Sequence, residues 1–357
     1  MITTNNEKYS TPVPVSSIIK SIFSQGHLGV MSDSGESAPK DSDEEVKRYR
    51  KLADQGDAEA QANLGTMYAF GEGVPKDSAE AVKWYRLAAD QGLAEAQANL
   101  GLIYANGEGV PMNSGEAVKW YRLAADQGDA EAQFNLGLMY DNGDGVPKNS
   151  AKAVKWYRLA AEQGHAEAQF NLGVTYLNGD GVPKDSAQAV KWFGLVADQG
   201  DSRAQNNLGW MYTNGEGVPK DSAKAVKWYR LAADQGNAEA QLTLGTMYAN
   251  GEGVPKDNAE AAKRWRLAAD QGLAGAQFNL GCIYAKGEGV PKDSAKAAKW
   301  CRMAAEQGHV RAQFTLGWMH QLGYGVPKDS AKAAKWYRKA VKQGHAEAKA
   351  KLDLMLA

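Results

Sequence analysis

Residues 58–93 read AEAQANLGTMYAFGEGVPKDSAEAVKWYRLAADQGL, and seven further copies of this unit follow without a gap, up to residue 345. Gly65 returns every 36 residues as far as Gly317, and Pro75 does so as far as Pro327. A fixed period of this length is typical of a repeat array. Each unit of such an array contacts only its neighbours, so we expect one elongated domain without a single central core.

Each unit contains two stretches that are expected to be helical. Residues 58–70 carry apolar side chains at helical spacing, and a second such stripe begins at Ser78. Gly71 and Pro75 end the first helix, because glycine adopts the left-handed conformation and proline cannot continue a helix. Asp77, which is Asp or Asn in every copy, is placed to cap the second helix. Both connections are short, so the two helices form an antiparallel hairpin.

The same pattern sets the domain organisation. We expect an all-α solenoid of about 18 helices, with a half repeat at 38–57, eight full repeats at 58–345 and a capping helix at 346–357. The half repeat is expected to form one helix over residues 41–56. Residues 1–37 lack the repeat and are rich in Ser, Thr, Pro and Gly, so they are interpreted as a disordered, polar tail.

Three sequence features predict how the helices pack. Gly65 and its equivalents lie inside the first helix, where glycine costs about 1 kcal/mol relative to alanine, so a neighbouring ring or backbone is expected to pack there. The regularly spaced tryptophans of the second helix, beginning with Trp84, are interpreted as contacts between repeats. In repeat six, Arg264-Trp265 stands where the first repeat has Trp84-Tyr85. This exchange indicates either a local kink or sequence drift.

Composition excludes several classes of protein. The formal charge of the 357 residues is −1, so no global field favours nucleic acid, and no run approaches the 18 apolar residues of a membrane helix. Cys282 and Cys301 are too few for a disulfide framework, and we expect them to be free thiols.

Residues 310–357 carry nine Lys or Arg and three acids, a balance of +6. This excess is either a solvated terminal cap or a docking site for an anionic partner.

The unit resembles a known family. The segments AEAQANLG (94–101), GEGVP (107–111), AVKWYR (117–122) and AADQG (124–128), with Tyr104 between the first two, closely resemble the Sel-one-like repeat, a relative of the tetratricopeptide repeat. The resemblance covers residues 38–357. It implies a right-handed superhelix of antiparallel helix pairs and a role as an adaptor or scaffold for proteins; some bacterial members are implicated in signalling, envelope processes or host interaction. Some secreted members staple each helix pair with a disulfide, and this chain departs from that branch.

Differences between the copies suggest where a partner binds. Packing positions should be uniform along the array, whereas three positions of the first helix, represented by Ala62, Thr66 and Ala69, vary most and share one face. In related solenoids this helix lines the concave surface. We therefore predict a partner-binding groove, in which rigid aromatic side chains can act as anchors. The predicted groove residues are Phe134, Leu138, Phe170, Trp210, Leu242, Phe278, Phe314 and Trp318. The alternative is that these side chains are core between adjacent helices.

Catalytic, metal and cofactor sites are not expected. His309 and His345 lie one repeat apart, too far to converge on one metal ion. Ser17-Ile18-Ile19-Lys20 matches the Ser-x-x-Lys motif of penicillin-recognising enzymes, but it falls in the expected tail and no base can be named for it. The Gly-Glu-Gly loops lack the Gly-Lys-Ser ending of a phosphate loop.

The sequence therefore favours a non-enzymatic scaffold, monomeric and cytoplasmic, that binds a protein partner through a peptide or helix in its concave groove. No cofactor, nucleic acid or membrane span is expected. One alternative is a secreted bacterial effector, exported without a recognisable signal peptide. Another is a hydrolase-like repeat protein that acts on cell-wall or antibiotic compounds.

Overall fold

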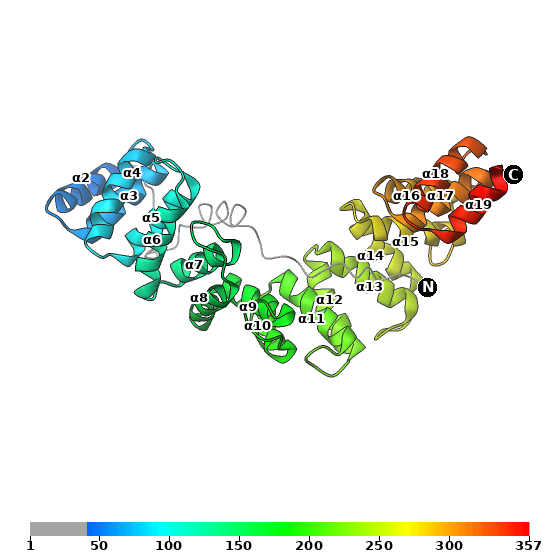
Figure 1. Cartoon of the computed structure of the whole chain (residues 1–357), viewed down its shortest axis with the longest axis horizontal. Helices are drawn as coiled ribbons and strands as arrows, with labels where there is room; N and C mark the ends of the chain where they lie inside the picture. Colours follow the sequence, from blue (N-terminus) through cyan, green and yellow to red (C-terminus); the bar gives the residue numbers. More distant parts are fainter. Residues whose placement is uncertain (1–40, 357) are drawn as a thin grey trace. The chain divides into compact units, whose positions relative to one another are not determined.

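The computed structural model describes residues 41–356, which form eighteen α-helices and contain no strand (Figure 1). The predicted tail, residues 1–37, lies outside the described residues. The helices are α2 (Asp41–Asp54), α3 (Ala58–Phe70), α4 (Ser78–Asp90), α5 (Ala94–Asn106), α6 (Ser114–Asp126), α7 (Ala130–Asn142), α8 (Ser150–Glu162), α9 (Ala166–Asn178), α10 (Ser186–Asp198), α11 (Ser202–Asn214), α12 (Ser222–Asp234), α13 (Ala238–Asn250), α14 (Asn258–Asp270), α15 (Ala274–Lys286), α16 (Ser294–Glu306), α17 (Val310–Leu322), α18 (Ser330–Lys342) and α19 (Ala346–Leu356).

The prediction of an all-α solenoid of helix hairpins is confirmed. Each repeat contributes an odd-numbered helix, called helix A below, and the even-numbered helix that follows it, called helix B. The first predicted helix, residues 58–70, coincides with α3, and the last, predicted over 346–357, is α19, which is described as far as Leu356. The lone helix expected over 41–56 is α2, which ends two residues earlier, at Asp54.

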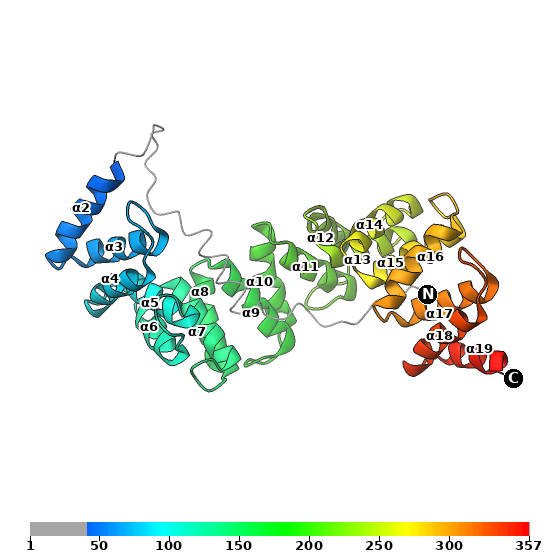
Figure 2. The same cartoon turned by 90° about the horizontal axis from the view of Figure 1, so that it is seen from above.

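The chain divides into two compact units, with the boundary inside α10. The described part of the first unit runs from residue 41 to Trp192, and the second unit runs on from Phe193. Within each unit, helix A packs on helix B of its own hairpin and on the helix B before it (Figure 2). The core of each unit is therefore a series of small clusters between successive helices.

Local chemistry starts and ends the helices as predicted. The Asp77 carboxylate accepts hydrogen bonds at 3.0 Å from the backbone N–H groups of Ala79 and Glu80, which have no partner inside α4. Gly71 ends α3 in the left-handed conformation, with φ of 80°, and its N–H donates to the carbonyl of Met67. These two signals explain why the helix bounds recur at the same place in every repeat.

The glycine inside helix A is packed against a ring, as predicted. A Cβ atom added to Gly137 in α7 would lie 2.6 Å from the ring of Tyr157 in α8, and similar short distances to a ring occur at Gly65, Gly101, Gly209, Gly245 and Gly317. In repeat seven the sulfur of Cys301 takes the place of the ring, 2.6 Å from the Cβ position of Gly281. The absence of a side chain lets helices A and B of one hairpin approach closely.

The Arg264-Trp265 exchange keeps this contact. The Trp265 ring lies against Gly245, where other repeats place the tyrosine, and its Nε1 donates to the Leu242 carbonyl at 3.2 Å. Arg264 takes the usual tryptophan position and bridges two carboxylates, Asp234 of the previous helix B at 2.6 Å and Glu260 at 2.7 Å. The exchange therefore replaces an apolar contact between repeats with an ionic one.

The other helix B tryptophans pack between repeats, as predicted. Trp84 lies against a cluster that includes Val46 of α2 and Leu64 of α3, and Trp120 belongs to a cluster with Ala62 and Tyr85 of the previous repeat. These two rings therefore join their hairpins to the preceding ones, and Trp156, Trp300 and Trp336 lie against clusters of the preceding repeat in the same way.

A network of buried glutamines, which the sequence interpretation did not include, also joins the repeats. Gln133 of α7 is 4% exposed, and its Nε2 donates to the carbonyl of Ala125, at the end of the preceding helix B, at 3.1 Å. Its Oε1 accepts from Gln163, at the end of its own helix B, at 2.8 Å. Equivalent bonds pair Gln91 with Gln61 at 2.8 Å and Gln307 with Gln277 at 2.9 Å.

Candidate partner-binding site

The exposed side of the A helices, called the helix A face below, was predicted to carry the partner-binding residues. Four of the eight predicted side chains are buried instead. Phe134 and Phe170 have no exposed surface, and Leu138 and Phe278 retain 2% and 8%. The prediction that these four are groove residues needs correction, because a buried side chain cannot contact a partner in this conformation.

The burial of the phenylalanines has a specific cause where a histidine follows one repeat later. The ring of Phe134 in α7 stacks on His165, the residue that caps α9, with the ring centres 4.6 Å apart. Phe278 stacks in the same way on His309, at 4.8 Å. The residue at this position of helix A therefore varies between repeats in part because it pairs with the residue that caps helix A of the next repeat.

The other four predicted side chains keep some exposed surface. Trp318 of α17 is 37% exposed, although its ring also lies 5.7 Å from that of Tyr324. Trp210, Leu242 and Phe314 are half-buried. For these four residues the assignment to a binding surface stays a prediction.

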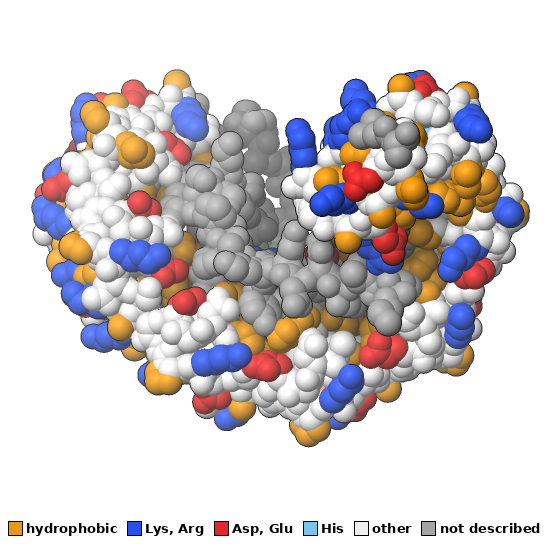
Figure 3. Space-filling model, turned by 45° about the vertical axis from the view of Figure 1, so that its right-hand side comes forward, with side chains coloured by type: hydrophobic (Ala, Val, Ile, Leu, Met, Phe, Trp, Pro, Cys, Tyr) orange, Lys and Arg blue, Asp and Glu red, His pale blue; other side chains and the backbone are white. Residues whose placement is uncertain are grey.

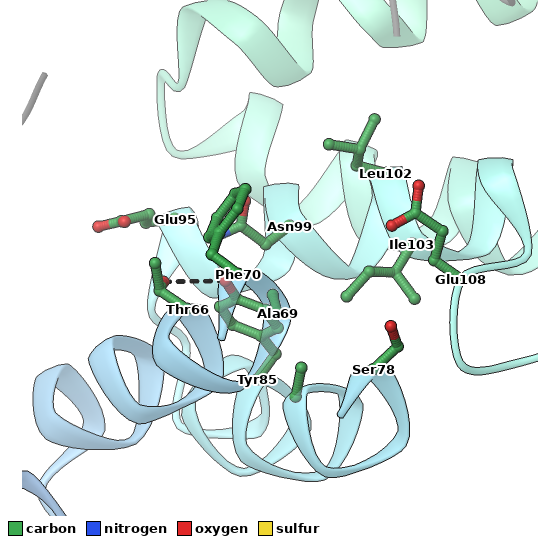
Figure 4. A pocket seen from close by; sticks show the side chains of 11 residues that line it. Thr66, Ala69, Phe70, Ser78, Tyr85, Glu95, Asn99, Leu102, Ile103 and Glu108 are labelled. Carbon is green, nitrogen blue, oxygen red and sulfur yellow. Dashed lines mark hydrogen bonds between the residues drawn. The ribbon is translucent and has the colours of Figure 1, made fainter. Parts of the chain in front are cut away.

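A pocket opens on the helix A face of the first unit, between α3 and α5 (Figure 4). It encloses about 140 Å³ and is lined at the variable positions by Thr66, Ala69 and Leu102, none of which is among the eight predicted groove residues. The remaining lining residues are Phe70, Ser78, Ala81, Tyr85, Glu95, Asn99, Ile103 and Glu108. The variable positions of helix A, which the sequence interpretation singled out, line part of this pocket, whereas the aromatic residues that it selected lie in other repeats.

The polar groups of the pocket are arranged around a buried tyrosine. The hydroxyl of Tyr85 lies 2.9 Å from the hydroxyl of Thr66, the contact dashed in Figure 4. Burial raises the pKa of Tyr85 to about 12, and the negative charge of Glu95 adds to the rise. The hydroxyl of Tyr85 is therefore neutral near pH 7, and it can donate or accept a hydrogen bond.

Each of the two units carries a regular row of exposed leucines on its B helices, which the sequence interpretation overlooked. Six leucines of the B helices, one per repeat, are between 36% and 49% exposed: Leu87, Leu123, Leu159, Leu195, Leu231 and Leu267. Their regular spacing was visible in the sequence, but a leucine in an amphipathic helix is normally assigned to the core. Because this row is the same in six repeats, it lacks the variation expected of a surface that selects one partner.

Charged side chains of both signs are interspersed on the face that Figure 3 shows. The exception in the sequence is the basic excess of residues 310–357, whose lysines are exposed. Lys339 lies over the ring of Trp336, 4.4 Å from its centre, and Lys332 forms an ion pair with Asp329 at 3.3 Å. The structure therefore shows a solvated basic surface on α18, compatible with either interpretation of the sequence.

Residues with potential redox or metal chemistry are isolated. Cys282 and Cys301 are free thiols, as expected, and burial raises the pKa of both, which makes them poor nucleophiles. Among residues 41–356, no three His, Cys, Asp or Glu side chains are grouped so as to hold a metal ion. No described helix has the length and apolar character needed to cross a membrane.

One cap is expected to make stability depend on pH. The Nδ1 atom of His309 accepts the N–H of Ala312 at 3.2 Å, which requires an unprotonated Nδ1. Burial, assisted by the charge of Arg311, lowers the pKa of His309. Because the folded state favours the neutral ring, this cap contributes fully to the free energy of unfolding above the pKa of the unfolded state, about 6.5. The contribution is lost as the pH falls through the lower pKa of the folded state.

The His309→Asn variant should lose less stability than the wild type between pH 7 and pH 5, measured as the urea midpoint. Asparagine does not titrate, and Asn237 already caps α13 in the equivalent place, at 3.0 Å from Ala240 N. At pH 8 both proteins have a cap, so the difference between their midpoints there measures the lost stacking of His309 on Phe278 and serves as the baseline for the comparison at lower pH. An equal acid-dependent loss in the two proteins would exclude His309 as the cause.

A comparison with known protein families gives the same repeat boundaries as the sequence. The family model described as Sel1 repeat matches the chain eight times, over residues 58–93, 94–129, 130–165, 166–201, 202–237, 238–273, 274–309 and 310–345. No curated protein matches the chain.

Two solved structures are similar over most of this chain. One is a protective antigen of uropathogenic Escherichia coli with an SLR fold, 42% identical, with a TM-score of 0.82; the match covers 86% of this chain but only 66% of that one. The other is a Sel1 repeat protein from Oxalobacter formigenes, 34% identical, with a TM-score of 0.70, covering 94% of this chain and 99% of that one. With eight matched repeats and these two related folds, the chain belongs to the Sel1 repeat family.

Proposed function

We propose that the protein is a non-enzymatic scaffold that binds a peptide or helix of a partner protein along its helix A face. The observation that carries the proposal is the pocket between α3 and α5, which is lined at the variable positions by Thr66, Ala69 and Leu102. Solenoids of this family typically mediate interactions between proteins.

The division of roles between positions supports this function. The residues that hold the fold together, Gly137 within a hairpin and Gln133 between repeats, are the same in every repeat, so a change there would damage the fold. Thr66 and its equivalents can change without breaking these contacts, and they therefore allow recognition of a particular partner. Weak contacts on several repeats would add up through avidity.

A site-specific cross-linking experiment tests the choice of face. A photoreactive phenylalanine analogue is placed at Phe70 or Trp318 on the helix A face, and at Leu159 or Leu231 on helix B as matched exposed controls. After irradiation in the cells that produce the protein, we expect one partner to be cross-linked from the helix A positions and not from the leucines. Cross-links from the leucines alone would overturn the proposal.

A substitution gives the second readout. The Trp318→Ala variant should bind the cross-linked partner more weakly, since aromatic anchors at interfaces often contribute 2 kcal/mol or more, roughly a factor of 30. Its thermal midpoint should stay close to that of the wild type, because the ring is 37% exposed. If the midpoint falls and the affinity does not, Trp318 is a packing residue and not an anchor.

A further inference from the structure

The pocket between α3 and α5 carries negative charge and no positive charge. Glu95 of α5 and Glu108 of the following loop lie on opposite sides of it, with Phe70 and Asn99 between them, and no Lys or Arg is among its lining residues (Figure 4). Glu95 is exposed, whereas Glu108 is half-buried and accepts a hydrogen bond from Asn106 at 3.3 Å. A half-buried carboxylate is screened less by water and salt than an exposed one.

Small differences from the neighbouring repeats explain why the pocket forms here. Thr66 is smaller than the residues at the same position in the next two repeats, Leu102 and Leu138, which are buried. Phe70 adds an aromatic wall where the next repeat has Asn106. The side chains of this pair of repeats therefore combine an open space, an aromatic ring and two acids.

The environment of Glu95 differs from that of its equivalent one repeat later. Glu131 is held by His165 at 3.0 Å and by Asn135 at 3.1 Å. The residue equivalent to His165 beside Glu95 is Asp129, whose carboxylate is used to cap α7 and cannot donate to another carboxylate. The charge of Glu95 is therefore available to a cationic group from outside.

We propose that this pocket binds the basic side chain, arginine or lysine, of a segment of the partner protein. The aliphatic part of such a side chain fits the apolar wall formed by Phe70 and Ile103, and its cationic end is attracted by Glu95 and Glu108. This inference rests on the proposed function, and it adds the chemical class of the residue that the scaffold recognises.

Short peptides test the pocket without knowledge of the partner. The probes are acetylated and amidated pentapeptides with arginine, lysine or neutral citrulline between alanines, and binding to the full chain is followed by ligand-observed nuclear magnetic resonance. We expect the arginine and lysine peptides to bind and the citrulline peptide to bind about tenfold more weakly, the difference expected for a charge-assisted contact. Equal binding of citrulline and arginine would overturn the proposal.

Substitutions then locate the site. Glu108→Gln should weaken binding of the arginine peptide about tenfold, and more than Glu95→Gln, because Glu108 is less exposed. Thr66→Trp should block the pocket, and tryptophan already stands at the equivalent positions 210 and 318 without disturbing helix A. If neither Glu108→Gln nor Thr66→Trp reduces binding, the peptide binds elsewhere and the inference is wrong.

A matched control removes the same charge from another pair of repeats. Glu239→Gln with Glu252→Gln changes the equivalents of Glu95 and Glu108, in the second unit, where Trp210 takes the position of Thr66. This double variant should bind the arginine peptide as the wild type does. If it loses as much affinity as Glu95→Gln with Glu108→Gln, the peptide responds to net charge and the pocket is not its site.

The cross-linking experiment separates this inference from the proposed function. If the partner is cross-linked from the helix A face and Glu108→Gln leaves its capture unchanged, the scaffold function stands and the basic-residue pocket fails. If the arginine peptide binds the pocket but the partner is cross-linked only from the helix B leucines, the pocket chemistry stands and the proposed face is wrong.

Discussion

Replacing Gln133 with methionine is expected to lower the free energy of unfolding by about 2 kcal/mol, since two hydrogen bonds of about 1 kcal/mol each are lost. Methionine is similar in length, so no large cavity forms. The lost bonds join Gln133 to the Ala125 carbonyl at 3.1 Å and to Gln163 at 2.8 Å, and the side chain is 4% exposed. Urea unfolding followed by circular dichroism measures the change.

Gln163→Met provides the control for this network. Gln163 is exposed and shares only one of the two bonds, so its replacement should cost about half as much. If Gln133→Met costs no more than Gln163→Met, the bond to the Ala125 carbonyl contributes nothing measurable, and the buried glutamines do not stabilise the junction between repeats.

Replacing Gly137 with alanine is expected to destabilise the array by about 1–2 kcal/mol, although alanine is the better helix former. The added Cβ would lie 2.6 Å from the ring of Tyr157 and 3.3 Å from the carbonyl of Ala153, so α7 and α8 must move apart. The cost of this overpacking is larger than the gain in helix propensity. The urea midpoint again gives the change.

The same substitution at Gly194 should have the opposite sign. Gly194 also lies inside a helix, α10, but no atom lies within 4 Å of the position that its Cβ would take. Alanine there should raise stability by about 0.5–1 kcal/mol, the propensity difference alone. If alanine raises stability at both positions, the rings beside helix A can move aside at little cost. Close packing would then not explain why the glycine recurs.

The helix bounds could be predicted because their signals are local. Gly71 and Asp77 act on the backbone within a few residues, and both recur in each copy at the same place, so the repeats confirm one another. The ring contact at Gly65 could also be inferred, since glycine inside a helix needs a reason. These predictions required no knowledge of how separate repeats meet.

Apart from the helix B tryptophans, the contacts between repeats were harder to predict. A glutamine in an amphipathic helix is usually solvated, so Gln133 was not assigned to the core, although its recurrence in every repeat is the signal that could have marked it as buried. Phe134 was assigned to a groove because it varies, but its ring stacks on His165. Variation between copies can record a local pairing as well as a partner, and one sequence does not separate the two.

The contacts between neighbouring hairpins have a consequence for how the gene can change in length. The second glycine of each loop, such as Gly145, lies so close to the backbone of the preceding repeat that its Cβ position is 2.3 Å from the Ser114 carbonyl oxygen. Since the bond from Gln163 to Gln133 recurs with the same spacing, the loss or duplication of 36 residues recreates an equivalent junction. A deletion whose length is not a multiple of 36 residues leaves glycine and glutamine out of phase with their partners. Recombination can therefore lengthen or shorten the array in whole units and leave the surviving binding positions intact.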